Sequence, residues 1–239
     1  GKSLPDSISH IQSQVADIEH HMLHFLDNHD EQRLASPEFA GTPEKGKPLM
    51  VVSTLISTSP TMVYFGQEVG EAGNENGGFG THSRTSIFDY VGVPNHQRWM
   101  NNGKFDGGQL SASEKSLRDF YKRLLNFTIK SPALMGDFQE IQTINRTETS
   151  GYDPGIYSFV RWSNEQKLIV VANFSWLTTS NFELKIPEDV IQKWNLKDGT
   201  YSLKEQLYGK HNAKLKVING KGHVNLSIAP SESFVLEVK

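Results

Sequence analysis

Two short apolar segments, each ending abruptly in polar residues, constrain the fold of this chain more than any other feature. Residues 22–26 are followed by Asp27-Asn28-His29-Asp30, and residues 61–65 are followed by Gly66-Gln67-Glu68. Short apolar segments of this kind are typical of buried parallel strands, whose carboxyl ends present polar side chains. Helical periodicity precedes the first segment, over residues 7–18, and a helix is predicted between the segments over residues 49–57.

Alternating helices and strands predict a parallel sheet. Two strands do not make a stable parallel sheet or barrel alone, so we expect the remaining strands to come from residues that precede this sequence. A long segment, residues 70–110, is rich in glycine. A structureless loop of that length is uncommon in a compact domain, which suggests that it contains short elements or has a function. The helix that follows begins at Ser111 with a capping-box pattern, Ser-x-x-Glu.

The pattern changes to period two after Ser131-Pro132. Turns such as Asp198-Gly199 and Asn219-Gly220 separate the apolar stretches. Many short strands at this spacing predict an antiparallel β-sandwich. We place the domain boundary between residues 1–132 and 133–239. The predicted strands are residues 157–162, 168–174, 182–186, 201–207, 215–218, 223–228 and 233–238.

Composition excludes several classes of function. The net charge is −3, which gives no basic surface for nucleic acid or an anionic membrane, and no apolar run approaches the roughly 18 residues that cross a bilayer. The sequence contains no cysteine, which excludes disulfides, thiolate metal sites and a cysteine nucleophile. Among its nine histidines, His20 and His24 have H-x-x-x-H spacing, but the strand predicted to begin there would splay them apart, so no metal site is assigned.

The two polar strand ends resemble a known family. Phe25-Leu26-Asp27-Asn28-His29-Asp30 is similar to the Phe-x-x-Asn-His-Asp segment that ends the seventh barrel strand of α-amylase-type (GH13) glycoside hydrolases. Tyr64-Phe65-Gly66-Gln67-Glu68-Val69-Gly70 resembles the segment after their eighth strand. The resemblance implies an α/β plus all-β fold: the carboxy-terminal part of a (β/α)8 TIM barrel, with strands seven and eight and flanking helices, and then the antiparallel sandwich.

The same resemblance implies roles for individual residues. Asp30 matches the family's third carboxylate, which hydrogen-bonds sugar hydroxyls and stabilises the oxocarbenium-like transition state. His29 is expected to donate to the same sugar, whereas Asn28 either positions the turn or contacts substrate. The nucleophile and the general acid would lie on earlier strands, so the isolated chain is expected to be inactive. The parent's calcium site would also lie upstream, and we expect no cofactor within this chain.

Other side chains leave two interpretations open. Arg33 either lines the cleft or pins its loop to a neighbouring carboxylate. Arg84 and the aromatic residues of the long segment either bind sugar or cover helix ends. Tyr64, Gln67 and Glu68 are expected to brace the barrel mouth. In the second domain Trp162 is expected in the core, and Trp176 or Trp194 could form a secondary glucan site. The aromatic and acidic residues of the long segment are Phe88, Asp89, Tyr90 and Trp99.

The leading interpretation is therefore part of a retaining hydrolase of α-1,4-glucosidic bonds in starch, glycogen or maltodextrins. The alternatives are a carbohydrate-binding module and a structural domain without catalysis. The expected partner is an α-glucan, not nucleic acid or a membrane. Self-association through the edges of an incomplete barrel is expected as well. The compartment is open, although the periplasm or the cell exterior suits starch degradation.

Overall fold

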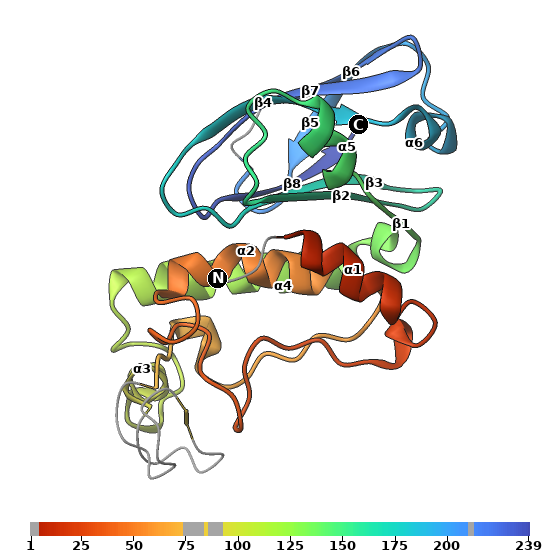
Figure 1. Cartoon of the computed structure of the whole chain (residues 1–239). Coiled ribbons are helices and arrows are strands. Elements are labelled where there is room, and N and C mark those ends of the chain that lie inside the picture. The colour runs from red at the N-terminus through yellow and green to blue at the C-terminus, as the bar shows by residue number, and fades with distance from the viewer. Residues whose placement is uncertain (1–4, 74–83, 86–92, 210–212) are drawn as a thin grey trace. The chain divides into compact units, whose positions relative to one another are not determined.

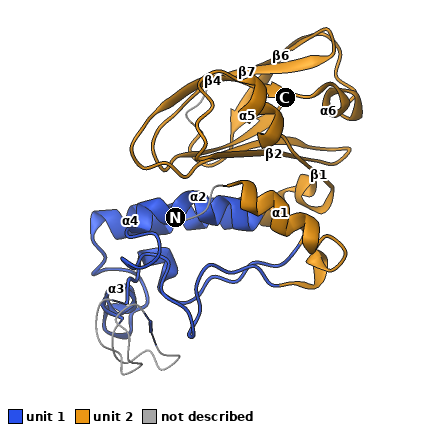
Figure 2. Cartoon of the chain, viewed as in Figure 1, with its two compact units in different colours: residues 1, 23–54, 59–126 blue, residues 2–22, 55–58, 127–239 orange. Residues whose placement is uncertain are grey.

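The computed structural model describes residues 5–73, 84–85, 93–209 and 213–239 (Figure 1). The chain divides into two compact units (Figure 2). Unit 1 contains residues 23–54 and 59–126, and unit 2 contains residues 2–22, 55–58 and 127–239. Each unit is described by itself below.

The two apolar segments of unit 1 meet in the parallel sense that the sequence predicts. His24 and Thr61 form a parallel bridge. The His24 N–H donates to the Pro60 carbonyl at 2.9 Å, and the Met62 N–H donates to the His24 carbonyl at 2.8 Å. The pairing does not extend into a longer ladder, so the full strands predicted over residues 22–26 and 61–65 are reduced to one bridge. A two-stranded parallel pair lacks the neighbours that normally bury it.

The helices of the first part of the chain differ in extent from the prediction. The first, α1 (Asp6–Gln14), ends earlier than expected and is followed by the short η1 (Glu19–His21). Helix α2 (Pro43–Leu55) begins within the segment expected to be a loop. Pro43 occupies its first position, where a missing N–H costs nothing, and the Lys45 N–H donates to the Thr42 hydroxyl at 3.4 Å.

The long glycine-rich segment contains short elements, as one of its two interpretations required. They are α3 (Pro94–Met100) and η3 (Asn101–Gly103), and the short η2 (Gln67–Val69) immediately precedes the segment. Helix α4 (Ala112–Lys130) follows, and its capping box is confirmed. The Ser111 N–H donates to Glu114 Oε2 at 2.7 Å, and the Glu114 N–H donates to the Ser111 hydroxyl at 3.3 Å. Over the described residues, no helix combines the length and the apolar character that a bilayer crossing requires.

The second part of the chain is an all-β domain, as predicted. Its eight strands form one antiparallel sheet in the order β1-β2-β3-β8-β5-β6-β7-β4. The sequence analysis missed β1 (Asp137–Glu140) and the short helices η4 (Pro132–Met135), α5 (Gln142–Glu148) and α6 (Glu188–Lys193), which are too short to show a clear period. The predicted strands are β2 (Ile156–Trp162), β3 (Lys167–Asn173), β4 (Ser180–Ile186), β5 (Gly199–Glu205), β6 (Lys214–Ile218), β7 (Lys221–Ile228) and β8 (Ser233–Val238).

The sheet curls because β5 belongs to both of its halves. The first residues of β5, Gly199 to Ser202, pair with β6, whereas Leu203 to Glu205 pair with β8. Apolar side chains from both halves therefore share one core, to which Ile169 of β3 and Val224 of β7 both belong. The Asn219-Gly220 turn between β6 and β7 is confirmed: both residues have positive φ, and Asp198 accepts both of their N–H groups.

Unit 2 also contains a buried arginine whose hydrogen bonds all go to main-chain carbonyls. Arg161 of β2 is buried, and its Nη1 donates to the Ile56 carbonyl at 2.8 Å, just beyond the carboxyl end of α2. Its Nη2 donates to the carbonyls of Leu134 at 2.5 Å and Gly136 at 3.2 Å. Burial lowers the pKa of Arg161 to about 10, so the guanidinium stays charged at neutral pH.

Replacing Arg161 should destabilise the protein strongly. Arg161→Met keeps most of the volume but leaves the carbonyls of Ile56, Leu134 and Gly136 without their donor, at a cost of about 3 kcal/mol or more in the free energy of unfolding. Arg146, which pairs with Asp6 near the surface of the same unit, provides the matched control. Arg146→Met should cost about 1 kcal/mol or less. Urea denaturation measures both values, and equal losses would contradict the role given to Arg161.

Candidate functional site

Asp30 and His29 lie on an exposed loop that follows the His24–Thr61 bridge. The side chain of Asp30 is 74% exposed and that of His29 is 52% exposed, with His29 Nε2 3.3 Å from Asp30 Oδ2. Asn28 shapes the loop, because its Oδ1 accepts the N–H groups of Asp30 at 2.7 Å and Glu31 at 2.8 Å. Asn28 was expected either to position the turn or to contact substrate, and these hydrogen bonds support the first role.

A fully buried ion pair belongs to the same loop. Arg33 Nε lies 3.3 Å from Asp27 Oδ2, and neither side chain is exposed to solvent. The same Asp27 oxygen accepts the Leu34 N–H at 2.9 Å. Burial raises the pKa of Asp27, against the opposing effects of the Arg33 cation and the Leu34 N–H. The pair closes the loop from residue 27 to residue 34 at its base.

Arg33 also connects this loop to the end of the second apolar segment. Its Nη2 donates to the Phe65 carbonyl at 2.6 Å and its Nη1 to the Thr85 hydroxyl at 3.0 Å. The guanidinium carbon lies 4.8 Å from the centre of the Tyr64 ring. All of these partners are protein groups. The geometry therefore supports the pinning role for Arg33 over the alternative of substrate contact. Arg84 is half-buried, and its Nε has no partner among the described residues.

Gly66 and Gln67, which follow the second apolar segment, constrain the site through their contacts. Gln67 is buried and donates through Nε2 to the Tyr121 hydroxyl of α4 at 3.1 Å. Gly66 has a φ of 81°, and a Cβ at this position would lie 3.0 Å from Glu71 Cβ and 3.4 Å from Arg33 Nη2. A side chain there would therefore be strained and would press on the arginine. The bracing expected of Gln67 agrees with these contacts.

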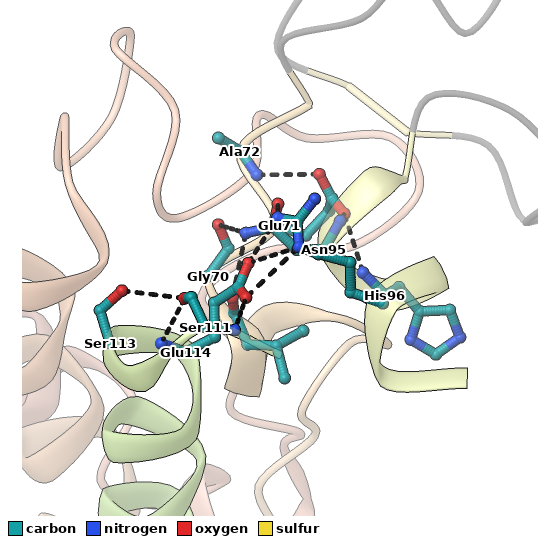
Figure 3. A network of polar contacts seen from close by, with 10 residues as sticks. Gly70, Glu71, Ala72, Asn95, His96, Ser111, Ser113 and Glu114 are labelled. Atoms are coloured by element: carbon teal, nitrogen blue, oxygen red, sulfur yellow. Dashed lines mark hydrogen bonds and ion pairs between the residues drawn. The ribbon is translucent and has the colours of Figure 1, made fainter. Parts of the chain in front are cut away.

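Glu71, which the sequence analysis did not single out, organises the segment that follows (Figure 3). Its side chain is buried, and its Oε2 accepts the N–H groups of Asn95 at 2.9 Å and His96 at 3.2 Å, at the start of α3. The side chain of Asn95 donates in turn, through Nδ2, to the carbonyls of Val69 and Gly70 at 3.0 Å each, just before Glu71 in the sequence. Burial raises the pKa of Glu71, although these N–H groups oppose the shift.

Glu114 continues this network into α4. Arg98 of α3 donates to both of its oxygens, through Nε at 3.0 Å and 3.3 Å, and also through Nη2. Burial would raise the pKa of Glu114, but the hydrogen bonds from Arg98 and Ser111 outweigh it and lower the pKa. Sequence reasoning identified Glu114 as a cap, but the pairing with Arg98 depends on tertiary structure.

The aromatic residues of the long segment form a row in which each ring packs on the next. His96 stacks on Trp99 with ring centres 5.6 Å apart, and Trp99 meets Phe105 edge to face at 5.8 Å. The Arg118 guanidinium of α4 lies 5.4 Å from the Trp99 ring. Trp99 thus contacts a side chain of α4, which favours the interpretation that the aromatic residues cover helix ends. Phe88, Asp89 and Tyr90 lie outside the described residues.

The exposed groups at this site can donate and accept hydrogen bonds. Asp30 supplies carboxylate oxygens, and His29 supplies ring nitrogens. No group of three or more His, Cys, Asp or Glu side chains in the described part of the chain could hold a metal ion.

Sequence comparison identifies the carboxy-terminal part of the chain. Residues 148–239 match the family described as "Alpha amylase, C-terminal all-beta domain". No curated protein matches the sequence.

Solved structures with a similar fold include several α-amylases. A noncanonic maltogenic α-amylase, AmyB from Thermotoga neapolitana, has 15% identity and a TM-score of 0.64, over 99% of this chain and 46% of that protein. A variant of AmyP in complex with maltotriose has 20% identity and a TM-score of 0.65, over 100% and 46%. The α-amylase from H. orenii has 17% identity and a TM-score of 0.60, over 98% and 44%.

The chain thus spans less than half the length of these structures. Its residues 148–239 match the family of α-amylase C-terminal all-β domains, and the chain as a whole has the fold of the carboxy-terminal part of these structures. The fold class predicted from the sequence is confirmed.

The two carboxylates of the network in Figure 3 predict opposite dependences of stability on pH. The pKa of Glu71 is raised above its unfolded value of 4.5, so its contribution is present below that pH and is lost as the pH rises through the raised value. The pKa of Glu114 is lowered, so its contribution is present above 4.5 and is lost as the pH falls through the lowered value.

Urea unfolding between about pH 3 and pH 7 tests both signs. The stability of the wild type relative to Glu71→Gln should fall as the pH rises, whereas its stability relative to Glu114→Gln should rise. Each variant serves as the control for the other, because both carboxylates lie in one network. Differences of the same sign would show that the electrostatic account of this network is wrong.

Proposed function

We propose that the chain is part of a retaining α-glucan hydrolase that acts on α-1,4-glucosidic bonds of starch, glycogen or maltodextrins. In this proposal Asp30 accepts hydrogen bonds from hydroxyls of the sugar on which positive charge develops. These bonds strengthen as the ring distorts toward the oxocarbenium-like transition state, and together they are worth several kcal/mol. Nucleophilic attack by Asp30 is not part of this role.

One observation carries the proposal. The carboxylate of Asp30 projects into solvent from the carboxyl side of a parallel bridge, on a loop that a buried ion pair closes at its base. A group that stabilises a transition state must be held in place before the reaction, and a buried ion pair beneath an exposed carboxylate meets this requirement. The structurally similar AmyP has been solved in complex with maltose and with maltotriose, which supports the same class of ligand.

The other residues of the site receive distinct roles in this proposal. His29 donates a hydrogen bond to the same sugar, and Asn28 positions the loop. Arg33 is a positioning residue that acts through Asp27 and the Phe65 carbonyl. Arg84, which precedes the Thr85 whose hydroxyl Arg33 contacts, is the further candidate for substrate contact.

The nucleophile and the general acid of a retaining glycosidase lie about 5–5.5 Å apart, and we propose that both come from residues outside this sequence. Residues 1–132 would then complete a catalytic barrel, and residues 133–239 would form its carboxy-terminal domain. The 239-residue chain alone should not hydrolyse glucans.

Asp30→Asn should abolish most of the activity in the full-length product of the gene that encodes this chain. The amide keeps the shape of the side chain but loses the charge that strengthens hydrogen bonds in the transition state. Loss of several kcal/mol corresponds to a fall in kcat of about a thousandfold or more for a chromogenic maltooligosaccharide.

Glu31→Gln is the matched control, because Glu31 is the adjacent exposed carboxylate on the same loop. Its kcat should stay within about threefold of the wild type, which corresponds to less than 1 kcal/mol. An Asp30→Asn enzyme of normal kcat, or an equal loss in both variants, would refute the role given to Asp30.

The isolated chain should also associate with itself. Large apolar side chains are exposed among its first 40 residues, and the single bridge leaves strand edges without partners. Sedimentation velocity should therefore show species larger than a 26.8 kDa monomer, and their population should rise with concentration. A monomer at all concentrations would contradict this expectation. The exposed side chains are Ile11, Ile18, Met22, Leu23, Phe25 and Phe39.

A further inference from the structure

The turn between β6 and β7 joins an asparagine to a glycine in a chemically reactive order. Asn219 and Gly220 form the turn, with φ values of 51° and 74°, and the ladder closes on either side of them at the pair Ile218–Lys221. Asn219 is exposed, so water reaches its side-chain amide. A glycine that follows an asparagine has no side chain to hinder attack by its own nitrogen on that amide, which is one reason why asparagine is a thermolabile residue.

Asp198 holds the reactive nitrogen of this turn. Its Oδ1 accepts the Gly220 N–H at 3.0 Å, and its Oδ2 accepts the Asn219 N–H at 2.9 Å. The N–H groups of Gly220 and Asn219 lower the pKa of Asp198 below its ordinary value of 3.8, so the acceptor is a charged carboxylate at neutral pH. Asp198 lies directly before β5, 21 residues ahead of Asn219, and therefore no local pattern in the sequence connects the two.

Deamidation of Asn219 requires the nitrogen that Asp198 holds. Base removes the proton of the Gly220 N–H, the nitrogen bonds to Cγ of Asn219, and the Cγ–Nδ2 bond breaks as ammonia leaves. The resulting succinimide takes up one water molecule and opens to aspartate or isoaspartate. The N–H can lose its proton to base only after its hydrogen bond to Asp198 breaks, and the adjacent negative charge opposes formation of an anionic nitrogen.

We propose that Asn219 is a deamidation site whose reaction is suppressed by the hydrogen bond from the Gly220 N–H to Asp198. Conversion to isoaspartate adds a methylene group to the main chain of a two-residue turn. Because the length of a turn sets the register of its hairpin, the pairing of β6 with β7 is disrupted after the reaction. The site lies in unit 2 and does not depend on the proposed hydrolysis of glucans.

Peptide mapping of the 239-residue chain after incubation in mildly alkaline buffer tests the site. Trypsin cleaves after Lys216 and Lys221 and releases residues 217–221, in which Asn219 is the single asparagine. Mass spectrometry then measures the fraction of this peptide in which the amide has become an acid. Asp198→Ala should deamidate at least about threefold faster than the wild type, a modest factor because the hydrogen bond that is lost belongs to an exposed carboxylate. Asp198→Asn is avoided, because it would create a further Asn-Gly sequence.

Glu188→Gln is the matched control. Oε1 of Glu188 lies 3.8 Å from the position that a Cβ on Gly220 would take, but it accepts the Gln192 side-chain amide at 3.1 Å. The variant removes a charge near the turn and leaves the hydrogen bond to Asp198 in place, so its rate should stay within about twofold of the wild type.

A second measurement does not depend on the folding of a variant. The synthetic peptide of residues 217–221 lacks Asp198 and should deamidate at least about threefold faster than the same residues in the folded wild type. Incubation in water enriched in heavy oxygen identifies the reaction, because hydrolysis of the succinimide transfers one oxygen atom of water to the product. Circular dichroism should show that Asp198→Ala and Glu188→Gln keep the secondary structure of the wild type.

Several results would overturn the proposal. A rate for Asp198→Ala below the expected factor would show that its carboxylate does not suppress the reaction. Equal acceleration in Asp198→Ala and Glu188→Gln would show that nearby charge sets the rate and the hydrogen bond does not. A folded wild type that deamidates as fast as the synthetic peptide would show that the turn has no protection, and a product without heavy oxygen would exclude the succinimide route.

Discussion

The structure of unit 1 depends on the burial of one charged guanidinium. Arg33 is removed from water, and a charge in that position is tolerated only when ionic and hydrogen-bonding partners surround it. The partners come from separate parts of the sequence: Asp27, Phe65 and Thr85. Because the buried guanidinium of Arg33 needs all of these partners, it holds the loop that bears Asp30 against the end of the second apolar segment.

The carboxylates of unit 1 divide into structural groups and one exposed group. Asp27, Glu71 and Glu114 are buried, and each accepts main-chain N–H groups that would otherwise lack partners. Asp30 contacts only His29 among the side chains that the structure pairs with it, and most of its surface faces solvent. An exposed carboxylate supported by buried, hydrogen-bonded side chains is the arrangement expected for a group that binds a ligand. Such a carboxylate is not needed to hold the fold together.

Local patterns were enough to predict much of the fold. The capping box at Ser111 and the Asn219-Gly220 turn involve neighbours in sequence, so propensity and spacing identified them correctly. The strands of the all-β domain were equally clear, because alternation over five to eight residues is a strong signal. The early start of α2 was missed, since Gly46 and Pro48 made that segment look like a loop.

The interior of the site could not be predicted in the same way. Glu71 meets Asn95 across 24 residues, and Arg33 meets Thr85 across 52, so no local period connects them. The two interpretations of Arg33 differ only in whether its side chain is buried, which requires coordinates. The tryptophans of the all-β domain make the same point: alternation marks Trp162 as a core residue, but nothing local distinguishes the exposed Trp176 from the buried Trp194.

The position of β8 has a consequence for biosynthesis. It is the last strand in sequence, yet it lies inside the sheet between β3 and β5, and β5 is the strand that joins the two halves. The β1-β2-β3 part of the sheet and the β5-β6-β7-β4 part therefore have no direct pairing until β8 is inserted between them. On the ribosome, closure of this domain must wait until β8 has left the exit tunnel, and until then both neighbouring edges remain open to pairing with other chains.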